Sequence, residues 1–206
     1  MKEEIAKITR YLAIRGIFIR EGSASIDELS YLADLTQREN AQLIGEIGFN
    51  AGFSSYAFLK ANPRVEVVSF DIGHHRYVKS AKKFIDRQFP GRHKLIYGDS
   101  RDTVSRFAKE NPGVRFDLVF IDGGHDYEIA KADILNFKQL CTEKTAVVMD
   151  DLVPWLKWGM GPMKAWEEAV NDGLVKQEEV IKDGMRVNRV DPPGKNVWAL
   201  GRYVYK

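Results

Sequence analysis

Short apolar runs alternate with longer amphipathic stretches from about residue 42 onward. Runs of this kind are typical of strands buried on both faces, and the amphipathic stretches repeat apolar residues at helical spacing. The predicted strands cover residues 43–48, 65–70, 93–97, 116–121 and 145–149. The predicted helices between them cover residues 53–61, 75–88, 100–110 and 127–141. Strands that alternate with helices indicate an α/β fold with a parallel sheet covered on both faces.

Both ends of the chain depart from this alternation. Residues 3–20 and 25–35 predict two helices, the second of which begins with the capping box Ser25-Ile-Asp-Glu28. A further helix over 161–172 precedes two late strands, over 175–181 and 196–204. We therefore divide the chain into an N-terminal helical cap, residues 1–40, and one α/β domain, residues 41–206.

Composition narrows the class of protein further. The chain has 206 residues and is 44% hydrophobic, enough for one domain with a sizeable core. Its 31 basic and 29 acidic residues give a net charge of +2, too balanced to argue for a nucleic-acid or membrane partner. A single cysteine, Cys141, fits a reducing compartment, and the charged N-terminus resembles neither a signal peptide nor a membrane span. We expect a cytoplasmic protein, and an oligomer is compatible with the sequence.

A glycine turn follows the first predicted strand. Gly48 and Gly52 allow the backbone to turn tightly and to approach a ligand closely. Asp71 ends the second strand, where a carboxylate can accept both hydroxyls of a ribose. The dinucleotide pattern G-x-G-x-x-G is not met, because Asn50 and Phe53 stand at its second and third glycines. The combination predicts a nucleotide-like cofactor.

Three carboxylates end two successive strands. Asp122 ends the strand over 116–121, and Asp150 and Asp151 end the strand over 145–149. Neighbouring strands lie ~4.8 Å apart, so these acids can share one cation, and an all-oxygen ligand set suits Mg²⁺. Without a cation, Asp150 would cap the turn after its strand with Asp151 exposed, and Asp122 would either contact the cofactor or cap Gly123-Gly124. His125 is a candidate general base, and Asp126 is the alternative.

With these motifs the chain resembles the class I S-adenosylmethionine-dependent methyltransferases, from about Leu43 to the C-terminus. Glu46-Ile-Gly-Phe-Asn-Ala-Gly52 is similar to the first motif of that family, with Asn50 in place of a common glycine. The resemblance implies a Rossmann-like, mostly parallel seven-stranded sheet with helices on both faces and an antiparallel last strand. It also implies a set of residues around S-adenosylmethionine: Glu46, Gly48, Asn50, Gly52, Ser54, Asp71, Asp99 and Ser100.

Within the class, Phe120–Tyr127 followed by Val148–Leu152 resembles the metal-dependent O-methyltransferases of the catechol, sugar and antibiotic types. The resemblance implies that Asp122, Asp150 and Asp151 hold the metal. The Asp-Asp pair stands where an Asp-Asn pair is frequent in that family. The resemblance further implies that Asp122 and His125 act in catalysis.

The acceptor is less well defined by sequence. Trp155 and Trp158 follow the acidic pair and either wall a pocket for a planar acceptor or pack as core. The basic helix over 75–88 offers the best case for RNA, but it lacks interleaved aromatic residues and is typical of a solvated face. We predict Mg²⁺-assisted methyl transfer to a hydroxyl of a small molecule. The alternatives are a metal-independent methyltransferase acting on RNA or nitrogen, and a non-catalytic cofactor-binding subunit.

Overall fold

The computed structural model describes residues 1–18 and 24–205, and its centre is one sheet of eight strands in the order β3-β2-β1-β4-β5-β8-β6-β7. The first five strands are parallel, β8 is antiparallel to β5, and β6 pairs with β8 and β7 in antiparallel register. The strands are β1 (Leu43–Ile47), β2 (Glu66–Asp71), β3 (His93–Tyr97), β4 (Leu118–Ile121), β5 (Ala146–Met149), β6 (Val175–Lys182), β7 (Met185–Val187) and β8 (Val197–Tyr203).

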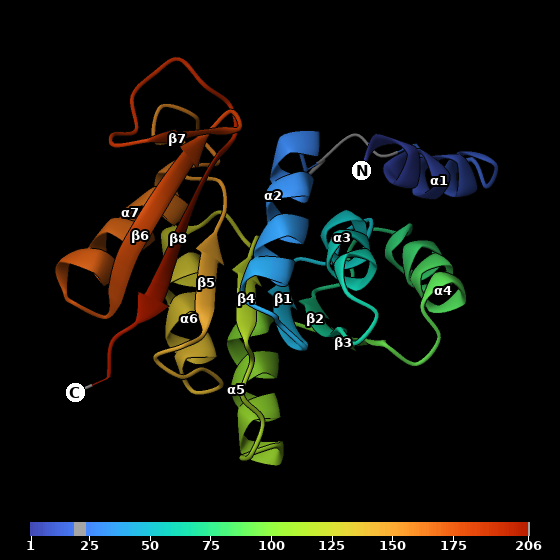
Figure 1. Cartoon of the computed structure of the whole chain (residues 1–206), viewed down its shortest axis with the longest axis horizontal. Helices are drawn as coiled ribbons and strands as arrows, with labels where there is room; N and C mark the ends of the chain where they lie inside the picture. Colours follow the sequence, from blue (N-terminus) through green and yellow to red (C-terminus); the bar gives the residue numbers. More distant parts are fainter. Residues whose placement is uncertain (19–23, 206) are drawn as a thin grey trace.

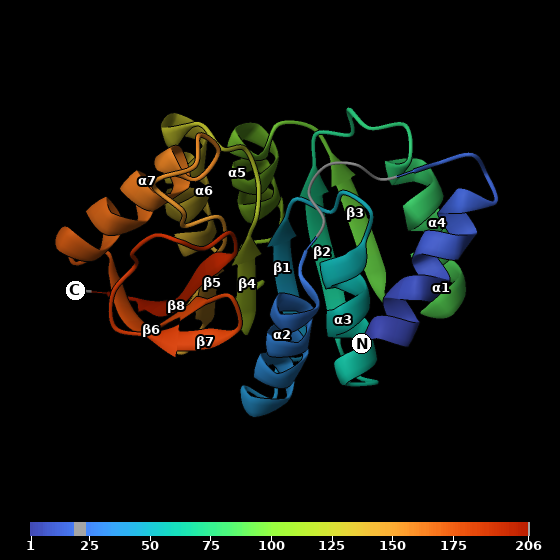
Figure 2. The ribbon, with the colours of Figure 1, turned by 90° about the horizontal axis from the view of Figure 1, so that it is seen from above.

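Helices cover both faces of this sheet, with α5, α6 and α7 on one side and α2 and α3 on the other (Figure 2). The helices are α1 (Lys2–Ala13), α2 (Ile26–Arg38), α3 (Phe53–Ala61), α4 (Val78–Gln88), α5 (Ser100–Glu110), α6 (Tyr127–Lys138) and α7 (Met160–Asn171). Strand β4 is buried throughout: Leu118 and Phe120 join the core under α2 and α3, and Val119 and Ile121 join the core under α5 to α7. This explains why its sequence is continuously apolar rather than alternating.

The structure confirms the predicted α/β fold with its antiparallel strands near the C-terminus, and adds an eighth strand, β7. Strand β7 follows β6 through Asp183 and Gly184, whose φ angles are +48° and +81°. An Asp-Gly pair with positive φ at both residues is the turn that best fits a two-residue hairpin. The dipeptide was visible in the sequence, so this strand was within reach of sequence reasoning.

The first predicted helix, residues 3–20, is too long. Helix α1 ends at Ala13, residues 14–16 form a turn, and residues 17 and 18 have no regular secondary structure. Residues 19 and 20 lie outside the described residues. Gly16, with a φ of +70°, adopts the left-handed conformation that commonly ends a helix.

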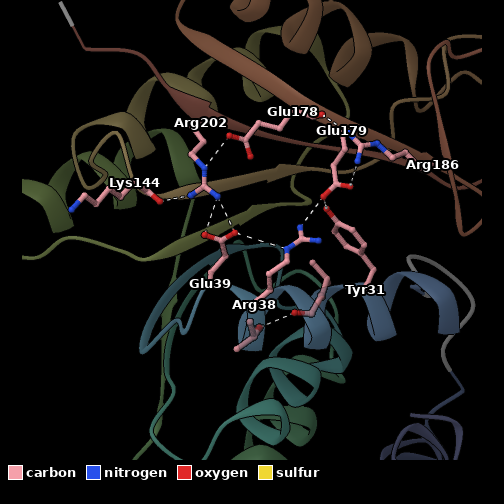
Figure 3. Close-up of polar contacts among 10 residues, drawn as sticks. Tyr31, Arg38, Glu39, Lys144, Glu178, Glu179, Arg186 and Arg202 are labelled. Carbon is pink, nitrogen blue, oxygen red and sulfur yellow. Dashed lines mark hydrogen bonds and ion pairs between the residues drawn. The ribbon is translucent and has the colours of Figure 1, made fainter.

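Helix α2 lies over the sheet and is held there by both apolar and polar contacts. Leu29 and Leu32 are fully buried in the core shared with the strands. At its C-terminal end, Arg38 forms an ion pair with Glu179 of β6 at 2.7 Å, part of the network drawn in Figure 3. Arg202 of β8 extends that network through an ion pair with Glu39, the residue directly after α2 (Figure 3). These contacts fix the axis of α2, and its N-terminal end consequently lies above the carboxyl ends of the parallel strands (Figure 1).

In the described parts of the chain, residues 1–18 and 24–205, no helix combines the length and the apolar character that crossing a membrane requires.

Candidate active site

A cavity of about 840 Å³ opens at the carboxyl ends of the parallel strands. This is the edge at which open α/β sheets bind ligands, and the volume is in the usual range for a small-molecule site. The residues predicted from sequence that line it are Gly48, Asn50, Asp71, Asp99, Ser100, Asp122, His125, Asp151 and Trp158. The remaining predicted residues, Glu46, Gly52, Ser54, Asp150 and Trp155, do not line it.

The turn after β1 needs the residues found in it. Gly48 has a φ of +94°, and a Cβ built on it would lie 1.8 Å from the backbone oxygen of Asp122. Asn50 has a φ of +47°, a left-handed conformation that asparagine tolerates better than most residues. The backbone N–H of Asn50 donates to Asp71 Oδ2 at 2.8 Å, and that of Gly73 donates to Asp71 Oδ1 at 2.7 Å. These two bonds hold the Asp71 carboxylate in place at the cavity wall.

Glu46 supports this turn from behind. Its fully buried carboxylate accepts hydrogen bonds of 2.5 Å from Ser54, Ser55 and Ser69. Burial raises the pKa of Glu46, while the three hydroxyl donors oppose that shift. The donors come from the start of α3 and from β2, so Glu46 joins the turn to both elements without reaching the cavity.

The loop after β3 contributes the third group of lining residues. Asp99 is the N-cap of α5 and accepts the backbone N–H of Arg101 at 2.9 Å. The Arg101 guanidinium also donates to both oxygens of Asp99, and these hydrogen bonds lower the pKa of that carboxyl. Asp99 is therefore ionised and fixed in orientation beside Ser100 at the cavity wall.

At the opposite end of the cavity, Asp122, His125 and Asp151 each offer one ligand atom, all within 4.8 Å of one another. His125 Nε2 lies 2.8 Å from Asp151 Oδ2, and this hydrogen bond raises the pKa of the imidazole. Burial, together with the charges of Asp151 and Glu28, holds the pKa of Asp122 well above its ordinary value. Asp151 has a φ of +61°, so its backbone is held in a conformation that favours Asp, Asn and Gly. Carboxylates and an imidazole that converge in this way fit a divalent cation.

Asp150 lies differently from the other two acids. It is buried and lines a smaller cavity of about 10 Å³, which it shares with Asp122 and Asp151. Glu28, at the start of α2, lies close enough to Asp150 to interact with it, and burial raises the pKa of Glu28 to about 7. Sequence reasoning missed Glu28 as part of this cluster, because the capping box already explained it and nothing local connects it to Asp150.

The loop after β5 packs directly on the acidic end. Trp158 is 45% exposed and lines the cavity, whereas Trp155 is turned away and donates through Nε1 to the backbone oxygen of Gly194 at 3.0 Å. The first turn of α7 lies against the loop that carries His125. A Cβ on Gly161 would come within 2.1 Å of the His125 backbone oxygen.

Basic residues on and near the helix predicted over 75–88 form contacts within the fold. Lys82 forms an ion pair with Asp86 on the same helix. Arg92 donates to three backbone carbonyls, those of Leu59, Asn62 and Val65. These cations stabilise local structure, which favours the solvated-face interpretation of this segment over an RNA surface.

A family model described as a methyltransferase domain matches residues 46–152. No curated protein matches the sequence significantly.

Several solved structures share the fold at low sequence identity. An O-methyltransferase from Bacillus cereus in complex with SAH has a TM-score of 0.76 at 15% identity, covering 97% of this chain and 90% of that one. The O-methyltransferase TomG from Streptomyces achromogenes, involved in tomaymycin synthesis and in complex with SAM, has a TM-score of 0.75 at 18% identity, covering 98% and 90%. The SAH-bound methyltransferase PaMTH1 from Podospora anserina has a TM-score of 0.72 at 17% identity, covering 96% and 88%.

Proposed function

The chain belongs to the methyltransferase domain family, and from this premise we propose that it transfers the methyl group of S-adenosylmethionine to a hydroxyl of a small molecule, with assistance from a divalent cation, Mg²⁺. One observation carries the proposal. A single cavity is lined by Asp71 and Asp99 after β2 and β3 and by the converging Asp122, His125 and Asp151 after β4 and β5, with the glycine turn after β1 between these two groups.

The first group suits the nucleoside part of the cofactor. The fixed Asp71 carboxylate still has lone pairs for the ribose hydroxyls, since each oxygen accepts only one backbone N–H. Asp99 and Ser100 would lie beside the base, and the turn over Gly48 and Asn50 would approach the rest of the molecule. When bound, S-adenosylmethionine supplies a sulfonium methyl group that an oxygen nucleophile can attack in line.

The second group suits the acceptor hydroxyl. Asp122 and Asp151 would hold the cation, with Asp150 as a third carboxylate behind them. The cation, when bound, orients the hydroxyl and lowers its pKa. His125 would take the hydroxyl proton on Nδ1, because Nε2 donates to Asp151, and the imidazole must be neutral for this step. Asp126, the alternative base, is the exposed N-cap residue of α6 and does not line the cavity, so the geometry favours His125.

The test is calorimetric titration of Mg²⁺ into the protein saturated with S-adenosylhomocysteine, for the wild type and for Asp151→Asn, Asp150→Asn and His125→Gln. We expect the wild type to bind Mg²⁺, and Asp151→Asn to bind it at least ~10-fold more weakly, because asparagine keeps the left-handed backbone but removes the charge. Weaker binding by Asp150→Asn would assign it to the ligand set.

His125→Gln separates two roles for the imidazole. If the imidazole is the base, its loss should leave Mg²⁺ affinity unchanged and should lower the rate of methyl transfer to a panel of catechols and sugars by ~10²-fold or more. Loss of Mg²⁺ binding in this variant would instead make the imidazole a ligand. A wild-type protein that binds S-adenosylhomocysteine but no Mg²⁺ would overturn the metal-assisted proposal and favour a metal-independent methyltransferase.

A further inference from the structure

The loop between β7 and β8 brings a cation to the cavity. Lys195 and Asn196 line it together with Trp158 and the acidic residues Asp122 and Asp151. Lys195 is the only lysine or arginine among the lining residues in the described part of the chain. From its position we propose that the methyl acceptor carries an anionic group, a carboxylate or a phosphate, which the Lys195 ammonium binds. This inference rests on the proposed function, because it assigns the acceptor of that same site.

The pairing of strands places Lys195 close to the acidic end. Strand β8 is antiparallel to β5, with Met149 opposite Ala199. The pairing continues past the end of β5, since the backbone N–H of Leu152 donates to the oxygen of Val197, the first residue of β8, at 2.8 Å. Residues 195 and 196 therefore lie beside the segment that directly follows Asp151. An acceptor whose hydroxyl reaches Asp151 and His125 therefore has Lys195 on the neighbouring loop segment, which lines the same cavity.

The loop that carries Lys195 is anchored on several sides. The backbone N–H groups of Lys195 and Asn196 both donate to Asp183 Oδ1, at 3.2 and 3.1 Å. Trp155 donates to the oxygen of Gly194, and Lys182 donates to the oxygen of Asp191 at 2.9 Å. With its backbone held in this way, Lys195 loses only side-chain freedom when it binds an anion.

The charge of Lys195 is available for a ligand. Within residues 1–18 and 24–205, no carboxylate forms an ion pair with its ammonium. The acids of the same cavity, Asp122 and Asp151, converge with His125 on the candidate cation position. A neutral acceptor would leave the ammonium without a partner, whereas an oxyanion would form a charge-assisted hydrogen bond with it. The half-exposed Trp158 indole on the same wall suits a flat ring between the hydroxyl and the anionic group.

Matched acceptors test this inference. Protocatechuate, its neutral amide and the corresponding dihydroxyphenyl phosphonate share a flat vicinal diol and differ only in the anionic group. Calorimetric titration of each would use protein that holds S-adenosylhomocysteine and Mg²⁺. We expect the acid to bind the wild type about tenfold more tightly than the amide, and Lys195→Met to remove that difference. Tighter binding of the phosphonate than of the carboxylate would identify phosphate as the preferred group.

The control is Lys157→Met, which removes an exposed lysine of the loop after β5 that does not line the cavity. This variant should keep the full preference for the acid. Equal binding of acid and amide by the wild type, a preference that survives Lys195→Met, or failure of the wild type to bind the acid would each overturn the inference. Titration with S-adenosylhomocysteine alone separates a failure of this inference from a failure of the proposed function. A wild-type protein that does not bind S-adenosylhomocysteine would contradict the proposed methyltransferase function.

Discussion

Asp133 offers a sharp test of the electrostatics beneath the site. Its carboxylate is fully buried on α6, and Gly123 of the loop after β4 packs against it so closely that a Cβ there would lie 2.9 Å from Oδ2. Neither oxygen receives a hydrogen bond of normal geometry. Ser100 and Arg101 favour the ionised form, but burial dominates and raises the pKa of Asp133 from 3.8 to about 7. We predict that Asp133→Asn stabilises the protein at neutral and alkaline pH.

The sign and the magnitude follow from proton linkage. The folded protein keeps a proton on Asp133 that the unfolded chain has already lost, so the free energy of unfolding decreases as pH rises from about 4 to about 7. At 1.36 kcal/mol for each pKa unit, the full effect is ~4 kcal/mol, of which ~3 kcal/mol develops between pH 5 and pH 8. Asparagine has nearly the same shape and does not ionise, so it removes this pH dependence.

The assay is urea unfolding at pH 5 and pH 8, followed by the fluorescence of the buried Trp166 and Trp198. The stability of Asp133→Asn relative to the wild type should be greater at pH 8 than at pH 5 by ~3 kcal/mol, a large part of a typical domain's stability. Asp102→Asn, which changes an exposed acid on α5, is the control and should show no such change. A difference between Asp133→Asn and the wild type that is the same at both pH values would refute the reasoning.

Two further predictions concern how the site is supported. Gly161→Ala should lower the rate of methyl transfer more than tenfold, because the new Cβ would displace the His125 backbone, and it should change S-adenosylhomocysteine affinity little. Gly113→Ala is the control in both assays, because its Cβ would meet no atom within 4 Å. Glu46→Gln should reduce the free energy of unfolding by ~1–3 kcal/mol in urea titrations, because the glutamine amide cannot accept all three serine hydrogen bonds. Unchanged stability would show that the three hydroxyls reorient freely.

Much of the fold was predictable because its signals are local. Each parallel strand is a short apolar run, and each is followed by a helix whose length and spacing are visible in the sequence. The glycine turn was predictable for the same reason, and Asn50 in a left-handed conformation shows why asparagine can replace glycine there. The strand β7 was missed although its Asp-Gly turn is also a local signal. The family match confirms the resemblance on which the expected fold relied.

Sequence reasoning found the site residues that directly follow a strand, because the end of a parallel strand already places its next side chain at the cavity. Asp71, Asp122 and Asp151 reach the cavity for that reason. Glu46 directly precedes Ile47, which lines the cavity. Successive side chains of a strand point to opposite faces, so the Glu46 carboxylate points away from the cavity, toward Ser54 and Ser55. The motif spacing could not distinguish a residue that lines the cavity from one that supports its wall.

Glu28 shows why sequence reasoning misses a residue whose role depends on contacts between distant segments. Its carboxylate accepts the backbone N–H of Ser25 in the capping box, so the local sequence accounts for it completely. Its contact with Asp150 exists only because α2 is docked on the sheet by its buried leucines and by the network of Arg38 and Arg202. The ion pairs of that network lie at the far end of the helix, so the position of an acid in the active-site region depends in part on ion pairs made elsewhere. Such dependence between distant segments is a property of packing and leaves no periodic or spacing signal in the chain.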